Sequence, residues 1–168
     1  PFGYPFVASI RSLRPVVDEL LVVVGDSTDK TREAVEAIDD RRIAILDSVW
    51  DEESRSSGKI FAQQANIGIA NATGDWAIHL QVDEVLHESA PGKIRACIER
   101  ADRTAAVDGL LFPFHHFWGD FDHVRNTRRT HQYEIRAFKN DGHVFSYRDS
   151  QGFRKYASSG AYRSGAAG

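Results

Sequence analysis

The first hundred residues alternate between strand-like and helix-like patterns, and this alternation limits the folds open to the chain. A continuous valine-rich run at 20–24 is typical of a strand covered on both faces. Further strands are predicted at 43–46 and 76–80, and helices at 6–13, from 27–29 to about 38, at 59–72 and at 89–101. Such alternation indicates βαβ units. We therefore predict an α/β fold with a mainly parallel sheet flanked by helices.

The C-terminal part has a different pattern. Strand-like segments at 107–117, 133–138 and 143–147 follow one another without helical spacing between them. This predicts a more antiparallel arrangement. We expect one domain over 1–156, in which 1–104 and 105–156 form two halves, and a disordered tail over 157–168, which is mostly small and polar.

Composition excludes several classes of protein. The 168 residues are 42% hydrophobic and 27% charged, as in an ordinary globular domain. No apolar run approaches the roughly 18 residues that cross a bilayer, although peripheral membrane association stays open. The net charge is −3, and Arg125, Arg128 and Arg129 form only a local basic patch, so we expect no nucleic-acid partner. A single cysteine, Cys97, fits a reducing compartment and predicts a cytoplasmic location.

Two polar segments are candidates for ligand binding. In the first, which follows the strand at 20–24, Asp26 can accept hydrogen bonds from a ribose or base, and Ser27 and Asp29 lie at a helix N-terminus that can bind an anion. A well-capped turn is the alternative explanation. In the second, the helix at 59–72, polar residues interrupt the apolar positions and predict a face turned to a cleft, or alternatively a solvated face. These polar residues are Lys59, Gln63, Gln64, Asn66 and Gly68.

The strand at 76–80 leads directly into acidic residues. Ligands of open α/β sheets bind outside the carboxyl ends of the strands, and carboxylates there suit a hard divalent cation. If the strand persists, Gln81 and Asp83 share one face and Glu84 points to the other. Asp83 is then the predicted metal ligand, and Glu84 a structural or substrate-orienting acid. A turn with exposed acids is the alternative.

The C-terminal part supplies candidate catalytic residues. His115 and His116 would face opposite sides of a strand, so only one of them can join a given site, and we choose His116. The nearby Trp118 is a natural platform for a sugar ring. Glu134 and Arg136 share a strand face and are expected to pair with each other, which would make Glu134 a weak base. Asp149, which follows the last strand, is therefore the preferred general base, and Glu134 is the alternative.

Three stretches in order, VVDELLVVVGDSTDKT, QQANIGIANATGDW and LQVDEVL, resemble the nucleotide-binding half of bacterial-type family 2 glycosyltransferases with the GT-A fold. The resemblance implies that Asp26 contacts the base or ribose, that the Asn66–Gly68 segment lies beside the phosphates, and that Asp83 is the last acid of a D-x-D-type metal motif. Further on, HHFWG, YEIRAF and DSQGFR resemble the acceptor side of the same family more loosely.

The resemblance also implies an activity. It is transfer of a sugar, as in a hexosyltransferase, from a nucleotide-diphosphate donor to a hydroxyl of a glycan or other acceptor, in cell-surface glycan synthesis, with Mn²⁺ or Mg²⁺ as cofactor. Two departures matter: Gln81 stands in place of the first acid, which should weaken metal binding, and the family's opening strand would fall before Pro1. A truncated or inactive module that binds a sugar nucleotide or glycan is therefore the alternative. The chain has no Gly-x-Gly-x-x-Gly or P-loop signature, which disfavours other nucleotide-binding α/β proteins.

Overall fold

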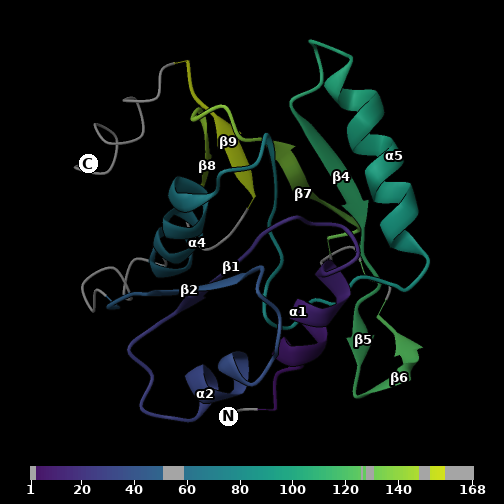
Figure 1. Cartoon of the computed structure of the whole chain (residues 1–168). Coiled ribbons are helices and arrows are strands. Elements are labelled where there is room, and N and C mark those ends of the chain that lie inside the picture. The colour runs from purple at the N-terminus through teal and green to yellow at the C-terminus, as the bar shows by residue number, and fades with distance from the viewer. Residues whose placement is uncertain (1–2, 51–58, 126, 128–130, 148–151, 158–168) are drawn as a thin grey trace.

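The structure is a computed structural model that describes residues 3–50, 59–125, 127, 131–147 and 152–157 (Figure 1). Its helices are α1 (Phe6–Leu13), α2 (Thr31–Glu36), α4 (Ile60–Asn71) and α5 (Ala90–Asp102). Its strands are β1 (Leu20–Val24), β2 (Ile43–Asp47), β3 (Trp76–Ile78), β4 (Gly109–Pro113), β5 (Phe117–Trp118), β6 (Asp120–Val124), β7 (Tyr133–Lys139), β8 (Val144–Ser146) and β9 (Phe153–Lys155). In this described part, no helix has the length and apolarity needed to cross a membrane.

Strands β1 and β2 form the parallel part of the fold. They pair from Leu20 opposite Ile43 to Val24 opposite Asp47, and α2 connects them, as the alternating pattern predicts. Side chains from α1, β1 and the α2 segment form the buried core next to this pair: Ile10, Leu13, Leu20, Val35 and Ile38. Burial of these aliphatic groups is the main stabilising contribution in this half of the molecule.

Strand β3 departs from the predicted arrangement. It pairs antiparallel with β7, with Trp76 opposite Lys139, in a sheet of order β3-β7-β4. Among the described strands, parallel pairing is therefore limited to β1 and β2, and the predicted mainly parallel sheet is shorter than expected. The hydrophobic pattern of β3 predicts a strand, and its residues are half-buried. The direction of its neighbour depends on a segment some sixty residues further along the chain.

The C-terminal part is antiparallel, as predicted. Strand β7 pairs with β4, β5 with β6, and β8 with β9, all in antiparallel register. In Figure 1, α5 lies beside β4, whereas the β8–β9 hairpin lies on the other side of β7, where Phe153 packs on Phe138 with ring centroids 4.5 Å apart. The β5–β6 hairpin projects at the lower right of that view, and all of its strand residues are exposed.

One side chain fastens α4 to the β8–β9 hairpin. The Asn66 amide donates through Nδ2 to the Ser146 carbonyl (3.2 Å) and accepts through Oδ1 from the Ser146 amide (2.8 Å). It therefore satisfies both backbone groups of Ser146, as a neighbouring strand would. Ser146 is 1% exposed, and an unpaired backbone group there would carry a substantial desolvation cost.

A buried ion pair fastens the segment after β3 to β7. Arg136 donates through Nε and Nη2 to the two carboxylate oxygens of Glu84, at 2.9 and 2.6 Å. Arg136 is also the extra residue of a β-bulge, since Leu110 lies opposite Ala137 and Leu111 opposite Ile135. Bulges re-aim side chains, and this one accompanies a bidentate contact that is almost fully shielded from water.

We predict that Glu84→Gln lowers the free energy of unfolding by about 3 kcal/mol, because it leaves the buried Arg136 guanidinium without a counter-charge. Urea unfolding followed by circular dichroism measures this loss. The matched control is Lys155→Gln, which removes a cation whose contacts with Asp108 and Asp141 are partly exposed and should cost less than about 1 kcal/mol. Equal losses in the two variants would contradict a special role for the buried pair.

Candidate active site

The first predicted segment begins where β1 ends. Gly25 leaves the strand, and the exposed Asp26 follows it. The indole of Trp50 lies against Gly25 so closely that a Cβ atom at this position would clash with its nitrogen. Trp50 also meets Phe61 of α4 edge to face, with centroids 6.1 Å apart. The sequence analysis missed Trp50, although its place shortly after β2 matches that of Asp26 after β1.

Ser27 and Asp29 are hydrogen-bonded to each other. Asp29 Oδ1 accepts from the Ser27 hydroxyl (2.7 Å) and from the Thr31 amide (2.9 Å) at the start of α2. Hydrogen bonds from Thr31 and then Ser27 hold the pKa of the Asp29 carboxyl well below its usual range. The capped turn that was the alternative explanation therefore describes these two residues. Asp26 is the acidic side chain of this exposed loop that takes no part in those hydrogen bonds.

The polar residues of the α4 region separate into two groups. Lys59 and Gln63 are exposed and available to a ligand. Asn66 is engaged with Ser146, so its amide positions α4. Gln64 accepts a short hydrogen bond from the hydroxyl of Ser48, which follows β2. Of the predicted residues on this helix, the two near its N-terminus are thus the ones that solvent can reach.

The acidic segment after β3 is a turn. The Glu84 amide donates to the Gln81 carbonyl (3.0 Å), and the Gln81 amide donates to Glu84 Oε2 (3.1 Å). The expectation that Gln81 and Asp83 share a strand face is therefore wrong, because the strand ends at Ile78 and the backbone folds back. Asp83 is exposed on this turn, whereas Glu84 has the structural role that the sequence analysis allowed for it.

The described residues contain no group of three or more His, Cys, Asp or Glu side chains that could hold a metal ion. Asp83 therefore belongs to no such group among the described residues. Magnesium is commonly bound by only one or two protein carboxylates together with substrate phosphates and waters. An exposed Asp83 fits that mode of binding, and an all-protein metal cage is not present in this part of the chain.

Glu134 and Arg136 do not form the expected pair. Arg136 is bound to Glu84, while Glu134 Oε1 lies 3.3 Å from Nδ1 of His131. The correction has two causes: the bulge at Arg136 interrupts the strand alternation, and Glu84 supplies a bidentate partner from a distant segment. The argument that made Glu134 a weak base therefore no longer holds.

His116 contacts His131, the residue that lies beside Glu134. Its Nε2 donates to the backbone carbonyl of His131 at 2.6 Å, since a carbonyl oxygen only accepts, and its ring stacks on Phe114 with centroids 5.8 Å apart. His116, His131 and Glu134 thus form a connected polar cluster, whereas His115 is exposed. Asp149 lies outside the described residues. Gly152, three positions later, lies beside Glu134, since a Cβ atom on it would be 3.8 Å from Glu134 Oε2.

Another histidine, His79, lies against β7, where its backbone amide donates to the Arg136 carbonyl (2.9 Å). His79 follows β3, and its ring meets Phe153 edge to face with centroids 5.2 Å apart. Its Nδ1 is buried and has no hydrogen-bond partner in the described part of the chain. Burial first, and then the positive charge of Arg136, lower the pKa of His79 to about 4, although Glu84 acts in the opposite direction. His79 is therefore neutral at physiological pH.

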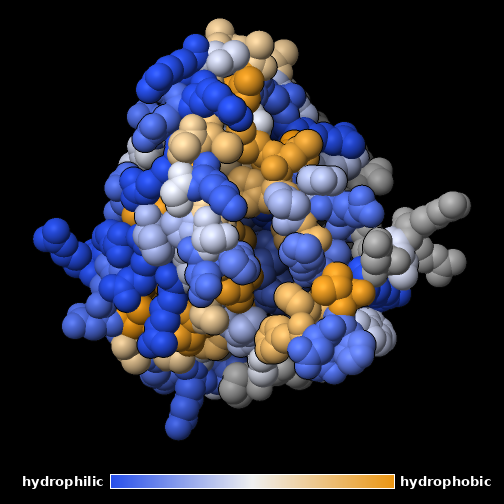
Figure 2. Space-filling view, turned by 90° about the vertical axis from the view of Figure 1, so that its right-hand side faces the viewer, coloured by the Kyte–Doolittle hydropathy of each residue, from blue (hydrophilic) through white to orange (hydrophobic). Residues whose placement is uncertain are grey.

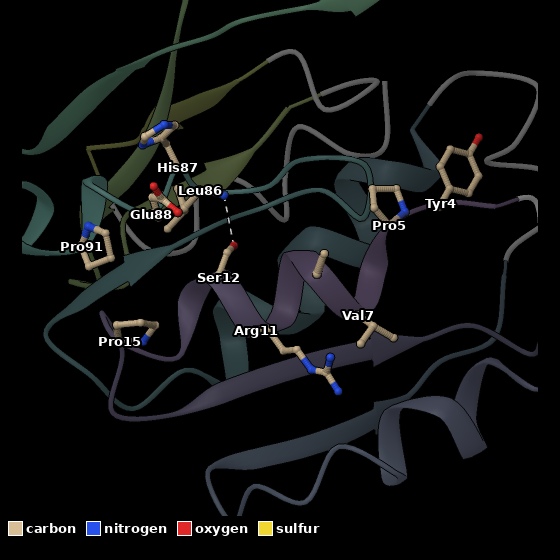
Figure 3. A pocket seen from close by; sticks show the side chains of 11 residues that line it. Tyr4, Pro5, Val7, Arg11, Ser12, Pro15, Leu86, His87, Glu88 and Pro91 are labelled. Atoms are coloured by element: carbon tan, nitrogen blue, oxygen red, sulfur yellow. Dashed lines mark hydrogen bonds between the residues drawn. The ribbon is translucent and has the colours of Figure 1, made fainter. Parts of the chain in front are cut away.

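A groove of about 730 Å³ lies elsewhere, between α1 and the segment that leads into α5 (Figure 3). Tyr4, Arg11 and His87 are among its lining residues, and the Leu86 amide donates to Ser12 Oγ (3.1 Å) across it. None of the predicted site residues that the structure describes lines this groove. Its size alone therefore does not connect it with the chemistry considered above.

The environment of His79 predicts a pH-dependent stability. The unfolded chain binds a proton at the ordinary pKa of about 6.5, but the folded protein does not until about pH 4, so stability falls as pH falls through this window. Between pH 7 and pH 5 the contribution of this group should be a loss of about 2 kcal/mol. Urea unfolding at both values measures it. His79→Phe should remove this part of the loss and His87→Gln, at an exposed position, should keep it; equal pH slopes in all three proteins would refute the assignment.

Comparison with known proteins gives a family for this geometry. A stretch of 116 residues is 26% identical to Elongation factor 2 from Cenarchaeum symbiosum (strain A), and covers 61% of this chain but only 16% of that protein. This limited likeness carries no functional argument. The model of Glycosyl transferase family 2 matches residues 4–159, which include Asp26, Asp83 and Glu134. Because the match extends over nearly the whole chain, the protein belongs to glycosyl transferase family 2.

Proposed function

We propose that this protein transfers a sugar from a nucleotide-diphosphate donor to a hydroxyl of an acceptor. The observation that carries the proposal is the family match over 4–159. The exposed carboxylates that follow two strands, Asp26 after β1 and Asp83 after β3, support it, because ligands of α/β sheets bind beyond strand ends. Residues 1–104 would bind the donor and residues 105–156 the acceptor, within one domain.

On the donor side we assign the nucleoside to Asp26, whose carboxylate can accept hydrogen bonds from ribose hydroxyls or from the base. The exposed Lys59 and Gln63 of the α4 region are the candidates for phosphate contacts. Ser27 and Asp29 act through the backbone, because their mutual hydrogen bond and the Thr31 contact fix the loop that presents Asp26. Asn66 acts through Ser146, by holding α4 in place.

A divalent cation, Mn²⁺ or Mg²⁺, belongs to the proposal with Asp83 as its protein ligand. The neutral Gln81 can add at most an amide oxygen, so a cation held here would depend mainly on the phosphates of the donor. When bound, the cation supplies neutralisation of the leaving diphosphate.

We predict that Asp83→Asn removes the metal-dependent part of nucleotide affinity, whereas Gln81→Asp increases Mn²⁺ affinity, because hard cations prefer charged oxygen ligands. Calorimetric titration with UDP, GDP and dTDP, each with and without Mn²⁺, measures both effects. Asp39→Asn, at an exposed position far along the chain from the turn, is the control and should bind as the parent does. Unchanged affinity in Asp83→Asn with Mn²⁺ present would exclude Asp83 as the metal ligand.

On the acceptor side we propose Glu134 as the general base and Asp149 as the second candidate. The base takes the proton of the acceptor hydroxyl. At the same time the oxygen of that hydroxyl bonds to the anomeric carbon of the donor sugar, and the nucleotide diphosphate leaves with the bonding electrons. Three features favour Glu134: its carboxylate is only partly shielded, it is not engaged by Arg136, and it lies beside His131. His116 is assigned a positioning role, since it binds the backbone of His131.

Glu134→Gln should reduce turnover by roughly 10²–10⁴-fold while leaving donor-nucleotide affinity nearly unchanged, because it removes only the proton acceptor. Steady-state rates of sugar release from the donor, together with the nucleotide titrations above, separate the two quantities. His115→Gln, a change at an exposed neighbour of the cluster, is the control. A large loss in Asp149→Asn with full activity in Glu134→Gln would transfer the role to Asp149.

A second candidate function is binding of a sugar nucleotide or glycan without turnover. Gln81 in place of an acid favours it, because it reduces the charge available to a metal, and Asp83 belongs to no group of three potential ligands among the described residues. Binding of UDP, GDP or dTDP without sugar release from the corresponding nucleotide sugars would establish this alternative. We further propose that the protein acts in the cytoplasm, in the synthesis of cell-surface glycans.

A further inference from the structure

The β5–β6 hairpin presents an aromatic and basic surface that the assignments above leave without a ligand. We propose that this hairpin binds an acidic saccharide unit, a sugar that carries a carboxylate or phosphate, as part of the acceptor. This inference rests on the proposed function, because it gives a chemical class to the acceptor of that reaction.

The hairpin forms a shallow hollow that is open to solvent. Its volume is about 270 Å³, and it is lined by Trp118, His123, Val124 and Arg125. Trp118 is 66% exposed, and Gly119 forms the turn after it with φ of 80°, a conformation that favours glycine. Figure 2 looks onto the side on which α5 and the hairpin lie in Figure 1, and shows apolar surface patches set among polar side chains.

The side chains around the hollow match an acidic sugar. The Trp118 indole offers a broad face on which the C–H groups of a sugar ring can stack. The Arg125 guanidinium lies over the same ring system, 4.7 Å from its centroid, and pairs with no carboxylate in the described part of the chain. The guanidinium is a planar, rigid fork of N–H groups, and placed over the ring it can bind a carboxylate or phosphate through two hydrogen bonds. The hollow thus combines a stacking surface with an anion-binding group.

His123 lines the hollow in a fixed orientation. Its Nδ1 lies 2.6 Å from Oδ1 of Asp120, which also accepts from the backbone amides of Asp122 and His123 at 3.0 Å. These contacts fix the imidazole at the edge of the hollow, where Nε2 can interact with a hydroxyl. The site is therefore partly ordered before a ligand arrives, which reduces the entropy lost on binding.

Backbone and side-chain contacts connect the hollow to the proposed base. The Arg125 amide donates to the His116 carbonyl at 2.6 Å. His116 in turn binds the carbonyl of His131, whose ring lies 3.3 Å from Glu134. The hairpin therefore extends directly from the cluster that would deprotonate the acceptor. An acidic unit bound at Trp118 would belong to the same acceptor molecule as the reacting hydroxyl.

A membrane surface is a poorer match for this hairpin. Asp120 and Asp122 place two carboxylates on β6, and the hydrogen bonds from His123 and the backbone keep the pKa of Asp120 below its usual value, so it stays ionised. Carboxylates are repelled by anionic lipid headgroups and are costly to insert among acyl chains. Phe121, which is 86% exposed and does not line the hollow, is the residue that would insert into a lipid surface.

The test is titration of the full chain with two disaccharides that differ only in one carboxylate, cellobiouronic acid and cellobiose. Tryptophan fluorescence and calorimetry report binding. The acid should bind roughly tenfold more tightly, as expected for charge-assisted hydrogen bonds to an arginine. Arg125→Gln should bring the two affinities to the same value, and Trp118→Ala should abolish binding of both. Phe121→Ala, on the same hairpin, is the matched control and should behave as the parent does.

Three outcomes would overturn the inference. The first is no saccharide binding, and the second is equal affinity for both disaccharides that Arg125→Gln does not change. The third is binding to phosphatidylglycerol vesicles that Phe121→Ala abolishes, without saccharide binding, since this would make the hairpin a membrane contact. UDP titration of the same proteins tests the proposed function separately. Nucleotide binding without a preference for the acidic disaccharide refutes the acidic subsite alone. A preference for the acidic disaccharide without nucleotide binding or turnover refutes the transferase alone.

Discussion

The buried contact between Arg136 and Glu84 determines how the two halves of this protein meet. Glu84 belongs to the turn that exposes Asp83, and Arg136 belongs to the strand that carries Glu134. One bidentate pair therefore fixes the predicted metal ligand and the proposed base to the same framework. The pair also leaves Glu134 without a cationic partner from its own strand, and places a positive charge near His79.

The site contains many polar residues, but most of them serve the framework. Asn66 completes the hydrogen bonds of Ser146, and Ser27 and Asp29 cap the start of α2. The exposed residues outside these contacts form a smaller set, of which Asp26 and Asp83 are the acidic members. This distribution is typical of a binding surface whose few contact groups are held by a larger number of satisfied hydrogen bonds.

Local sequence patterns were sufficient for the elements that depend on local physics. The amphipathic spacing of α1, the polar-interrupted α4 and the valine run of β1 all lie where the pattern predicts them. Contacts between distant segments were not predictable in this way. Glu84 and Arg136 are 52 positions apart, and neither alternation nor propensity shows that they meet. The turn at Gln81 was only the alternative to a continued strand, because the Glu84 side chain that closes it is placed by its distant partner Arg136. The closeness of Trp50 to Gly25 likewise requires two strands to be in register.

The double hydrogen bond between Asn66 and Ser146 has a consequence for motion. Helix α4 begins next to Lys59, which is assigned to the proposed donor site, and Ser146 belongs to the hairpin that packs against β7 through Phe153. Since one amide satisfies both backbone groups of Ser146, the helix cannot separate from the hairpin without exposing both at once. Fluctuations that open either element are then shared, so helix α4 and the β8–β9 hairpin form one cooperative unit of local unfolding and exchange their amide hydrogens together.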